Sequence, residues 1–134
     1  MIEINKALLD DAILKAKQSE KRRVAIDLRS TLEDNSQRML NALAPDTIVP
    51  IHRHRKTSET VVVISGALTE NFYDDQGNII ASYRLKPNSN IVGLNIPMGQ
   101  WHTVTDIEQG TVIFEAKDGK YAPPTEDDFL NTNM

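Results

Sequence analysis

The sequence predicts an all-β sandwich or barrel preceded by one short helix. Apolar and polar residues alternate with a period of two from Val24 onward, and turn residues separate these stretches at intervals of roughly 8–12 residues. Helical spacing is confined to the first twenty or so residues. At 134 residues a single domain is expected. We expect it to comprise a helical extension over residues 1–23, a barrel over 24–118 and a C-terminal tail over 119–134.

The predicted helix covers residues 5–17. Leu8, Ala12 and Ala16 recur at every fourth position, and Asn5 stands where an N-cap residue is expected. The pattern indicates a helix that packs on a sheet or on a neighbouring subunit.

The remaining elements are short strands joined by turn residues. Residues 37–44 fit either a helical turn or a strand, and periodicity alone does not decide between them. The acidic, proline-rich end of the chain is expected to lie along the surface or to be partly disordered. Strands are predicted over residues 24–28, 48–54, 59–64, 91–96, 101–105 and 111–116, and residues 72–80 read as two strands with a tight turn.

Composition excludes several classes of protein. With no cysteine, the chain has no disulfide scaffold, thiolate metal site or cysteine nucleophile, and it fits a reducing cytoplasm. A net charge of −4 argues against nucleic acid or an anionic membrane as the main partner. The sequence has neither a signal-peptide pattern nor an apolar run of transmembrane length.

The three histidines of the chain suggest one site. His52 and His54 are two residues apart on a predicted strand, so their side chains leave on the same face, and Arg53 and Arg55 face the other way. Glu59 opens the next strand after a short turn that can return its carboxylate to the imidazoles. His102 follows the turn at residues 97–99.

Three imidazoles and one carboxylate suit a divalent transition metal such as Fe, Mn, Co, Ni or Zn. A histidine in a core is more often hydrogen-bonded to backbone than bound to a metal, and a His-x-His pair alone is weak evidence. The four residues together, His52, His54, Glu59 and His102, carry the prediction.

The spacing of these residues resembles the two motifs of the cupin superfamily. His52-x-His54-x4-Glu59-x6-Gly66 is similar to the first motif, and Pro97-x-Gly99-x2-His102 to the second. Residues 24–123 further resemble the WbuC family of small cupin-fold metalloproteins, often encoded in bacterial surface-polysaccharide clusters. Residues 37–43, the turn at Pro45, residues 97–103, residues 110–115 and Gly119-x-Tyr121 carry this second resemblance. The resemblance implies a jelly-roll barrel, or double-stranded β-helix, that holds a metal inside on His52, His54, Glu59 and His102.

The resemblance implies one fold but leaves several reactions open. We expect a cytoplasmic, dimeric, metal-dependent enzyme acting on a small oxygen-rich molecule derived from a sugar or nucleotide sugar. The alternatives are an Fe- or Ni-dependent dioxygenase and a non-catalytic sugar-binding or regulatory module stabilised by metal.

No histidine remains for acid–base work, so other side chains are candidates. Tyr121, which could fold over a barrel mouth, is the first, and Tyr73 and Glu115 are further candidates. Glu70 and Glu115 alternate with apolar residues and could be inward-facing bases or solvent-facing residues. Trp101 is expected to pack outside the barrel wall because it precedes His102 on a strand.

Overall fold

The single helix begins where the sequence predicts. The structure, a computed structural model, describes residues 1–130, and helix α1 spans Lys6–Gln18. The side chain of Asn5 accepts a hydrogen bond of 3.0 Å from the backbone N–H of Leu8, which confirms the N-cap. No helix among the described residues is long and apolar enough to cross a lipid bilayer.

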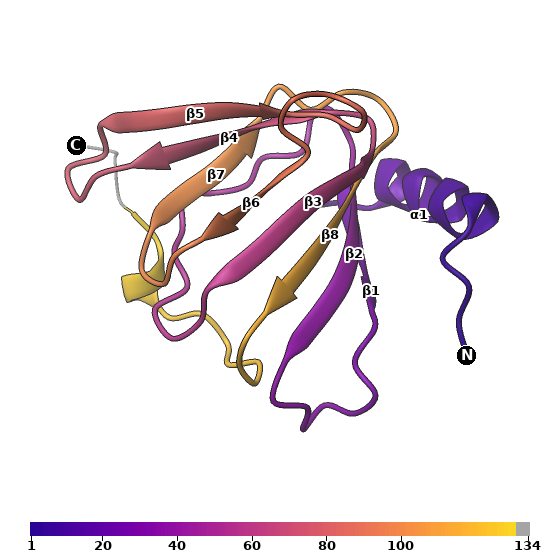
Figure 1. Ribbon diagram of the computed structural model, residues 1–134, viewed down its shortest axis with the longest axis horizontal. Helices are drawn as coiled ribbons and strands as arrows, with labels where there is room; N and C mark the ends of the chain where they lie inside the picture. Colours follow the sequence, from indigo (N-terminus) through magenta and orange to yellow (C-terminus); the bar gives the residue numbers. More distant parts are fainter. Residues whose placement is uncertain (131–134) are drawn as a thin grey trace.

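The strands form two antiparallel sheets that face each other (Figure 1). The larger sheet has the order β1-β2-β8-β3-β6 and the smaller has the order β5-β4-β7. The ambiguous segment at residues 37–44 is a strand, because it pairs along its whole length with β8. The bounds are β1 Arg23–Asp27, β2 Gln37–Leu43, β3 Glu59–Ser65, β4 Leu68–Tyr73, β5 Ile79–Leu85, β6 Gly93–Ile96, β7 Trp101–Thr105 and β8 Thr111–Lys117.

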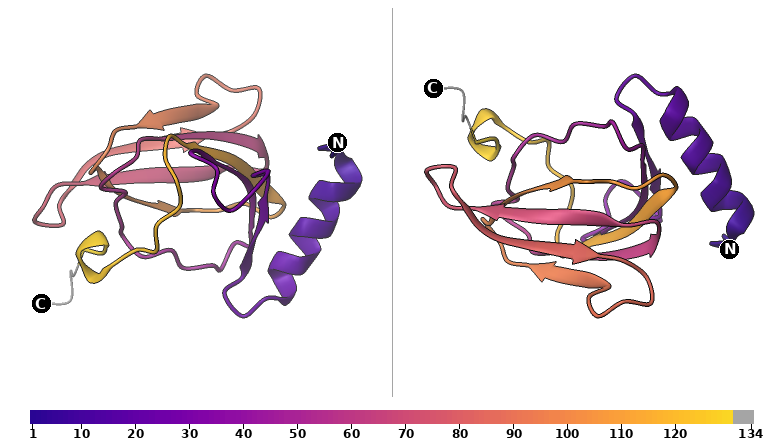
Figure 2. Two further views of the ribbon diagram at one scale, coloured as in Figure 1. Left: turned by 90° about the horizontal axis from the view of Figure 1, so that it is seen from below. Right: turned by 90° about the horizontal axis from the view of Figure 1, so that it is seen from above.

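The outer face of the larger sheet is apolar where the helix packs on it, and its inner face carries both polar and apolar side chains. Alternation along β2 sends Leu40 and Ala42 outward, where they pack with Ala12 and Ala16 of α1. The inward residues of β2, β3 and β8 instead line a cavity between the sheets. Figure 2 shows α1 on one side of the barrel and the C-terminal segment on the opposite side in both views. The helix therefore seals the outside of the wall whose inside carries the site.

The smaller sheet closes the barrel. β4 and β5 form the predicted hairpin, in which the turn is closed by the backbone N–H of Asp74 donating to the carbonyl oxygen of Asn78 at 2.9 Å. Gly77, at φ +84°, supplies the left-handed conformation that this turn requires. Leu68, Phe72 and Leu85 from this sheet join the buried core between the two sheets, with Val61 and Ile113 of the larger sheet.

The prediction of a strand over residues 48–54 is wrong. The segment is extended but irregular, and within it only His52 makes β-bridges, one to His102 and one to Phe129. Pro50 has no N–H to donate, which prevents a continuous ladder here. The chain nevertheless remains extended, so the alternation of side chains expected from a strand is preserved at His52 and His54.

Candidate metal centre

The two sequence-distant parts of the histidine cluster are joined through the backbone. His52 and His102 exchange a pair of hydrogen bonds, with the N–H of His52 donating to the carbonyl of His102 at 3.0 Å and the reverse bond at 2.8 Å. Directly paired residues of an antiparallel bridge carry their side chains on one face. The bridge therefore places both imidazoles side by side, with ring centroids 4.3 Å apart.

The third imidazole and the carboxylate complete the cluster. One ring nitrogen from each of His52, His54 and His102 lies within 4.8 Å of the other two. The Oε2 atom of Glu59 is 3.2 Å from Nε2 of His102 and 3.5 Å from Nε2 of His54. The structure thus brings together all four residues that the sequence predicts as metal ligands.

Backbone carbonyls orient two of the imidazoles. Nδ1 of His52 lies 2.8 Å from the carbonyl oxygen of Pro50, and Nδ1 of His102 lies 2.8 Å from that of Gln100. Each carbonyl accepts a hydrogen bond from Nδ1–H, so the proton stays on Nδ1 and the lone pair of Nε2 faces the centre of the cluster. This is the tautomer that a metal-bound histidine uses.

The buried carboxylate of Glu59 has an oxygen atom without a hydrogen-bond partner among the described residues. Glu59 is 4% exposed, and the atom without a partner is Oε2. Because this oxygen lies beside Nε2 of both His54 and His102, it requires either a cation or a proton on one of these nitrogens. The donor set of three neutral nitrogens and one carboxylate oxygen fits a divalent transition metal.

The pKa values around the cluster reflect the same arrangement. Burial, reinforced by the neighbouring His102, lowers the pKa of His52 to about 4. Burial also acts to lower the pKa of His102, but the adjacent, negatively charged carboxylate of Glu59 outweighs it and leaves that pKa raised. Burial would raise the pKa of Glu59, but the adjacent Nε2 atoms of His102 and His54 hold it well below its usual range. The carboxylate of Glu59 therefore favours a positive charge on the neighbouring His102.

The cluster opens into a cavity of about 680 Å³ between the sheets. Two further carboxyl groups, Glu70 on β4 and Glu115 on β8, line its walls, so the inward-facing alternative is the one found for both. The side chain of Asn41 on β2 donates a hydrogen bond of 2.9 Å to Glu115. The Oε2 atom of Glu70 is buried and has no hydrogen-bond partner in the described chain.

Both carboxyl groups tend to keep a proton. Burial raises the pKa of Glu70 to about 8. Burial and the nearby charge of Glu59 raise the pKa of Glu115 to about 7. Side chains that gain and lose a proton near neutral pH are suited to general acid–base chemistry.

The other candidate residues are placed differently. Tyr121 lines the cavity at its mouth and is 51% exposed, as the sequence suggested. Tyr73, at the end of β4, is not among the described residues that line the cavity. Trp101 lies outside the cavity, where its Nε1 donates to Asp75 and the guanidinium of Arg53 covers its ring at 4.3 Å. The expected outward position of Trp101 is confirmed.

The C-terminal segment forms one wall of the cavity mouth. The backbone N–H of Arg53 donates to the carbonyl of Asp128, and Leu130 donates to Ile51. The side chain of Arg55 binds the carboxylate of Asp128 at 2.7 Å. The tail thus lies along the surface, one of the two predicted states, and the prediction for residues 131–134 falls outside the described residues.

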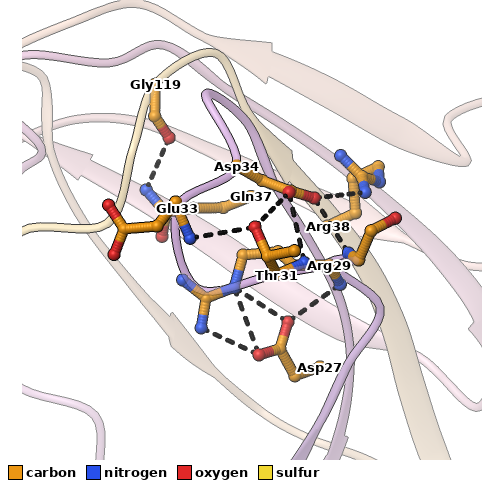
Figure 3. Close-up of polar contacts among 9 residues, drawn as sticks. Asp27, Arg29, Thr31, Glu33, Asp34, Gln37, Arg38 and Gly119 are labelled. Atoms are coloured by element: carbon orange, nitrogen blue, oxygen red, sulfur yellow. Dashed lines mark hydrogen bonds and ion pairs between the residues drawn. The ribbon is translucent and has the colours of Figure 1, made fainter.

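A polar network at the β1–β2 connection supports the same wall (Figure 3). Arg29 binds both carboxylate oxygens of Asp27, and Asp34 accepts hydrogen bonds from Thr31. From this end of β2, the side chain of Gln37 donates to the carbonyl of Gly119 at 3.1 Å. This last hydrogen bond ties the chain just before Tyr121 to the start of β2.

Asn41 is a cavity residue that the sequence pattern did not single out as a functional candidate. Asn41 lies in the segment that fitted either a helix or a strand, so its facing could not be assigned. In the strand, Gln37, Met39 and Asn41 all face the cavity. The available signal was the alternate positions Gln37, Met39 and Asn41, of which the first and last are polar.

A family model described as "Domain of unknown function (DUF6016)" matches residues 4–85, which are 82 of the 134 residues. A search of curated proteins finds no match to this sequence.

Several solved structures share the fold at low sequence identity. KdgF from Halomonas sp. is 12% identical, with a TM-score of 0.61 over 77% of this chain and 84% of that chain. The capsular polysaccharide assembling protein CapF from Staphylococcus aureus is 19% identical, with a TM-score of 0.65 over 84% of this chain and 33% of that chain. Oxalate decarboxylase from Bacillus subtilis is 18% identical, with a TM-score of 0.57 over 79% of this chain and 26% of that chain.

These likenesses confirm the cupin fold expected from the two histidine motifs. The chain spans about a third of the length of CapF and about a quarter of that of oxalate decarboxylase. At these identities the likeness concerns the fold, and fold alone does not select an activity.

Proposed function

This chain belongs to the DUF6016 family, a domain of unknown function, and we propose that it is a metal-dependent cupin enzyme acting on a small oxygen-rich substrate. One observation carries the proposal. The buried Oε2 atom of Glu59 has no hydrogen-bond partner in the described chain and lies 3.2 Å from Nε2 of His102, whose ring proton is held on Nδ1 by the carbonyl of Gln100. A bound divalent cation would satisfy that oxygen and the lone pair of that Nε2 at once.

His52, His54, Glu59 and His102 would hold the metal. When bound, it supplies Lewis acidity toward a carbonyl or hydroxyl oxygen of the substrate. The carbonyls of Pro50 and Gln100 keep two of these imidazoles in the binding tautomer throughout.

The side chains around the centre can move a proton. Glu70 and Glu115 flank the cavity, and their raised pKa values let them hold a proton near neutral pH. Glu115 is kept in position by Asn41, and Tyr121 at the mouth can donate a hydrogen bond to a substrate. Because Tyr73 does not reach the cavity lining in the described chain, Glu70 takes its place among our candidates.

The substrate is proposed to be derived from a sugar or nucleotide sugar. The resemblance to the WbuC family, with its surface-polysaccharide association, supports this class. So does the structural likeness to a protein described as assembling capsular polysaccharide. The cavity of about 680 Å³ is large enough for a monosaccharide. A cytoplasmic location and a homodimer remain predictions.

Metal analysis of the purified protein tests the assignment. We expect about one divalent ion per wild-type chain, and less than about a tenth of that in His52→Ala, His54→Ala and His102→Ala. Glu59→Gln keeps the size of the side chain but removes its charge, and should weaken metal binding by about 10- to 100-fold. Tyr73→Phe, outside the cavity lining, is the matched control. Stoichiometric metal in the histidine variants would show that the site lies elsewhere.

The same preparations distinguish the proposed activity from its alternatives. Oxygen consumption that depends on Fe or Ni would favour the dioxygenase. A ligand that binds but is recovered unchanged after long incubation would favour a sugar-binding or regulatory module. Conversion that His102→Ala abolishes, without oxygen consumption, supports the proposed Lewis-acid enzyme.

A further inference from the structure

Positively charged side chains are concentrated around the cavity. Six of the 15 lysine and arginine residues of the chain line it, compared with four of the 19 acidic residues. The cationic residues are Arg23, Arg53, Arg55, Lys56, Lys117 and Lys120. In a chain with a net charge of −4, this distribution gives the cavity the opposite sign to that of the whole protein.

Four of these six cations are already engaged by protein groups. Arg23 donates to the carbonyl of Ile48, and Arg53 donates to that of Asp127. Arg55 and Lys120 form ion pairs, with Asp128 and Glu33 respectively. These contacts hold neighbouring chain segments together, so the four side chains are not free to bind a ligand.

Lys117 differs from these four in its position and in its lack of a partner. It alternates along β8 with Ile113 and Glu115, both of which face the cavity, and it is half-buried. In the sheet it stands directly opposite Glu59, so the two side chains project from the same face. Within residues 1–130, no ion pair or hydrogen bond occupies its ammonium group.

The remaining cation of the six, Lys56, is less suited to bind a ligand in the cavity. It is exposed in the loop that precedes β3, with water available to it on most sides. A half-buried ammonium group next to the metal centre has lost part of its hydration, and a bound anion can restore that stabilisation.

We propose that Lys117 binds an anionic oxygen group, carboxylate or phosphate, of the molecule that occupies this cavity. The inference rests on the proposed function, since the same molecule would place another oxygen at the metal centre. It specifies the substrate class: the cavity selects an acidic sugar or sugar phosphate over its neutral counterpart. Glu59 and Glu115 are the acidic groups whose charge acts on Lys117. A metal on Glu59 would offset the first, and a proton on Glu115 would neutralise the second.

Binding of matched probe pairs to the metal-loaded protein tests this proposal by calorimetry. Galacturonate is compared with galactose, and glucose 6-phosphate with glucose, so that each pair differs in one anionic group. We expect one acidic member to bind about 10- to 100-fold more tightly than its neutral partner, as a charge-assisted hydrogen bond allows. The pair that shows the preference identifies the anion as carboxylate or phosphate.

Variants assign the preference to Lys117. Lys117→Gln should abolish the preference while retaining bound metal, and Lys117→Arg should largely restore it. Lys86→Gln, which removes an exposed lysine outside the cavity lining, should leave it unchanged.

Three results would overturn the proposal: equal binding within both pairs, no binding of any probe, or an acid preference that survives in Lys117→Gln. Loss of metal from Lys117→Gln would also overturn it, because the lysine would then serve only as a counter-charge to the site. Elemental analysis separates the two proposals. A wild-type protein that takes up no metal but still prefers the acidic probe contradicts the proposed function alone.

Discussion

Replacing Glu70 with glutamine should remove a pH-dependent loss of stability from the metal-free protein. Glu70 is 4% exposed, and burial raises its pKa from 4.5 to about 8. The folded protein therefore keeps a proton on this residue over a pH range in which the unfolded chain has lost it. Because the folded state binds more protons, stability falls as the pH rises through this window.

The magnitude follows from the two pKa values. Each pKa unit corresponds to about 1.4 kcal/mol, so Glu70 should lower the free energy of unfolding by about 3 kcal/mol between pH 4 and pH 7. Above pH 8 the loss approaches about 5 kcal/mol and then stays constant. A glutamine at position 70 cannot ionise, so Glu70→Gln should lack this contribution.

Urea unfolding of chelator-treated protein between pH 5 and pH 9 measures the effect. The informative quantity is the difference between wild type and Glu70→Gln at each pH, because the other titrating groups cancel in it. Glu20→Gln, at an exposed position, is the matched control and should follow wild type. A difference that stays constant from pH 5 to pH 9 would refute the reasoning, because Glu70 would then ionise as it does in water.

Two further predictions concern the frame around the site. Gly66→Ala should lower the free energy of unfolding by about 3 kcal/mol, because Gly66 has φ +73° and an added Cβ would lie 2.6 Å from Cα of Thr111. Gly110→Ala, at φ +79° with open space around it, should lose only about 1 kcal/mol, and equal losses in the two urea titrations would contradict the steric argument. Arg55→Ala should change global stability by less than about 1 kcal/mol but speed tryptic cleavage after Lys120, because it releases Asp128. The Lys6→Ala variant, which removes an ion pair in the helix, serves as control, and unchanged cleavage would mean that the backbone bonds alone hold the segment.

The parts of this molecule that could be predicted from sequence depend on short-range spacing. The cap at Asn5 and the shared facing of His52 and His54 follow from local geometry over a few residues. This spacing survived even where the predicted strand over residues 48–54 was wrong, because an extended chain alternates with or without a ladder. The cupin fold itself was recognised from the motif spacing around the histidines.

The remaining features depend on contacts between distant segments. Nothing local to residues 37–44 decides between helix and strand, since the deciding partner is β8, whose paired residues lie 68 to 80 positions further along the chain. The facing of Glu70 was likewise left open by alternation, because its burial depends on strands β5 and β7 on either side of β4 and on the cavity that they line. The role of the C-terminal segment arises from single bonds to Ile51 and Arg53, which no periodicity encodes.

The backbone bridge between His52 and His102 has a consequence for how the protein acquires its metal. The bridge and the bonds to the carbonyls of Pro50 and Gln100 fix two imidazoles through contacts that require no ion. Folding can therefore be complete before loading, unlike in small domains whose metal and fold appear together. One apoprotein preparation should accept different ions in turn without unfolding. The native ion would then be set by which metals the cell supplies and by how fast bound metal exchanges, and not by which metal is present when the chain folds.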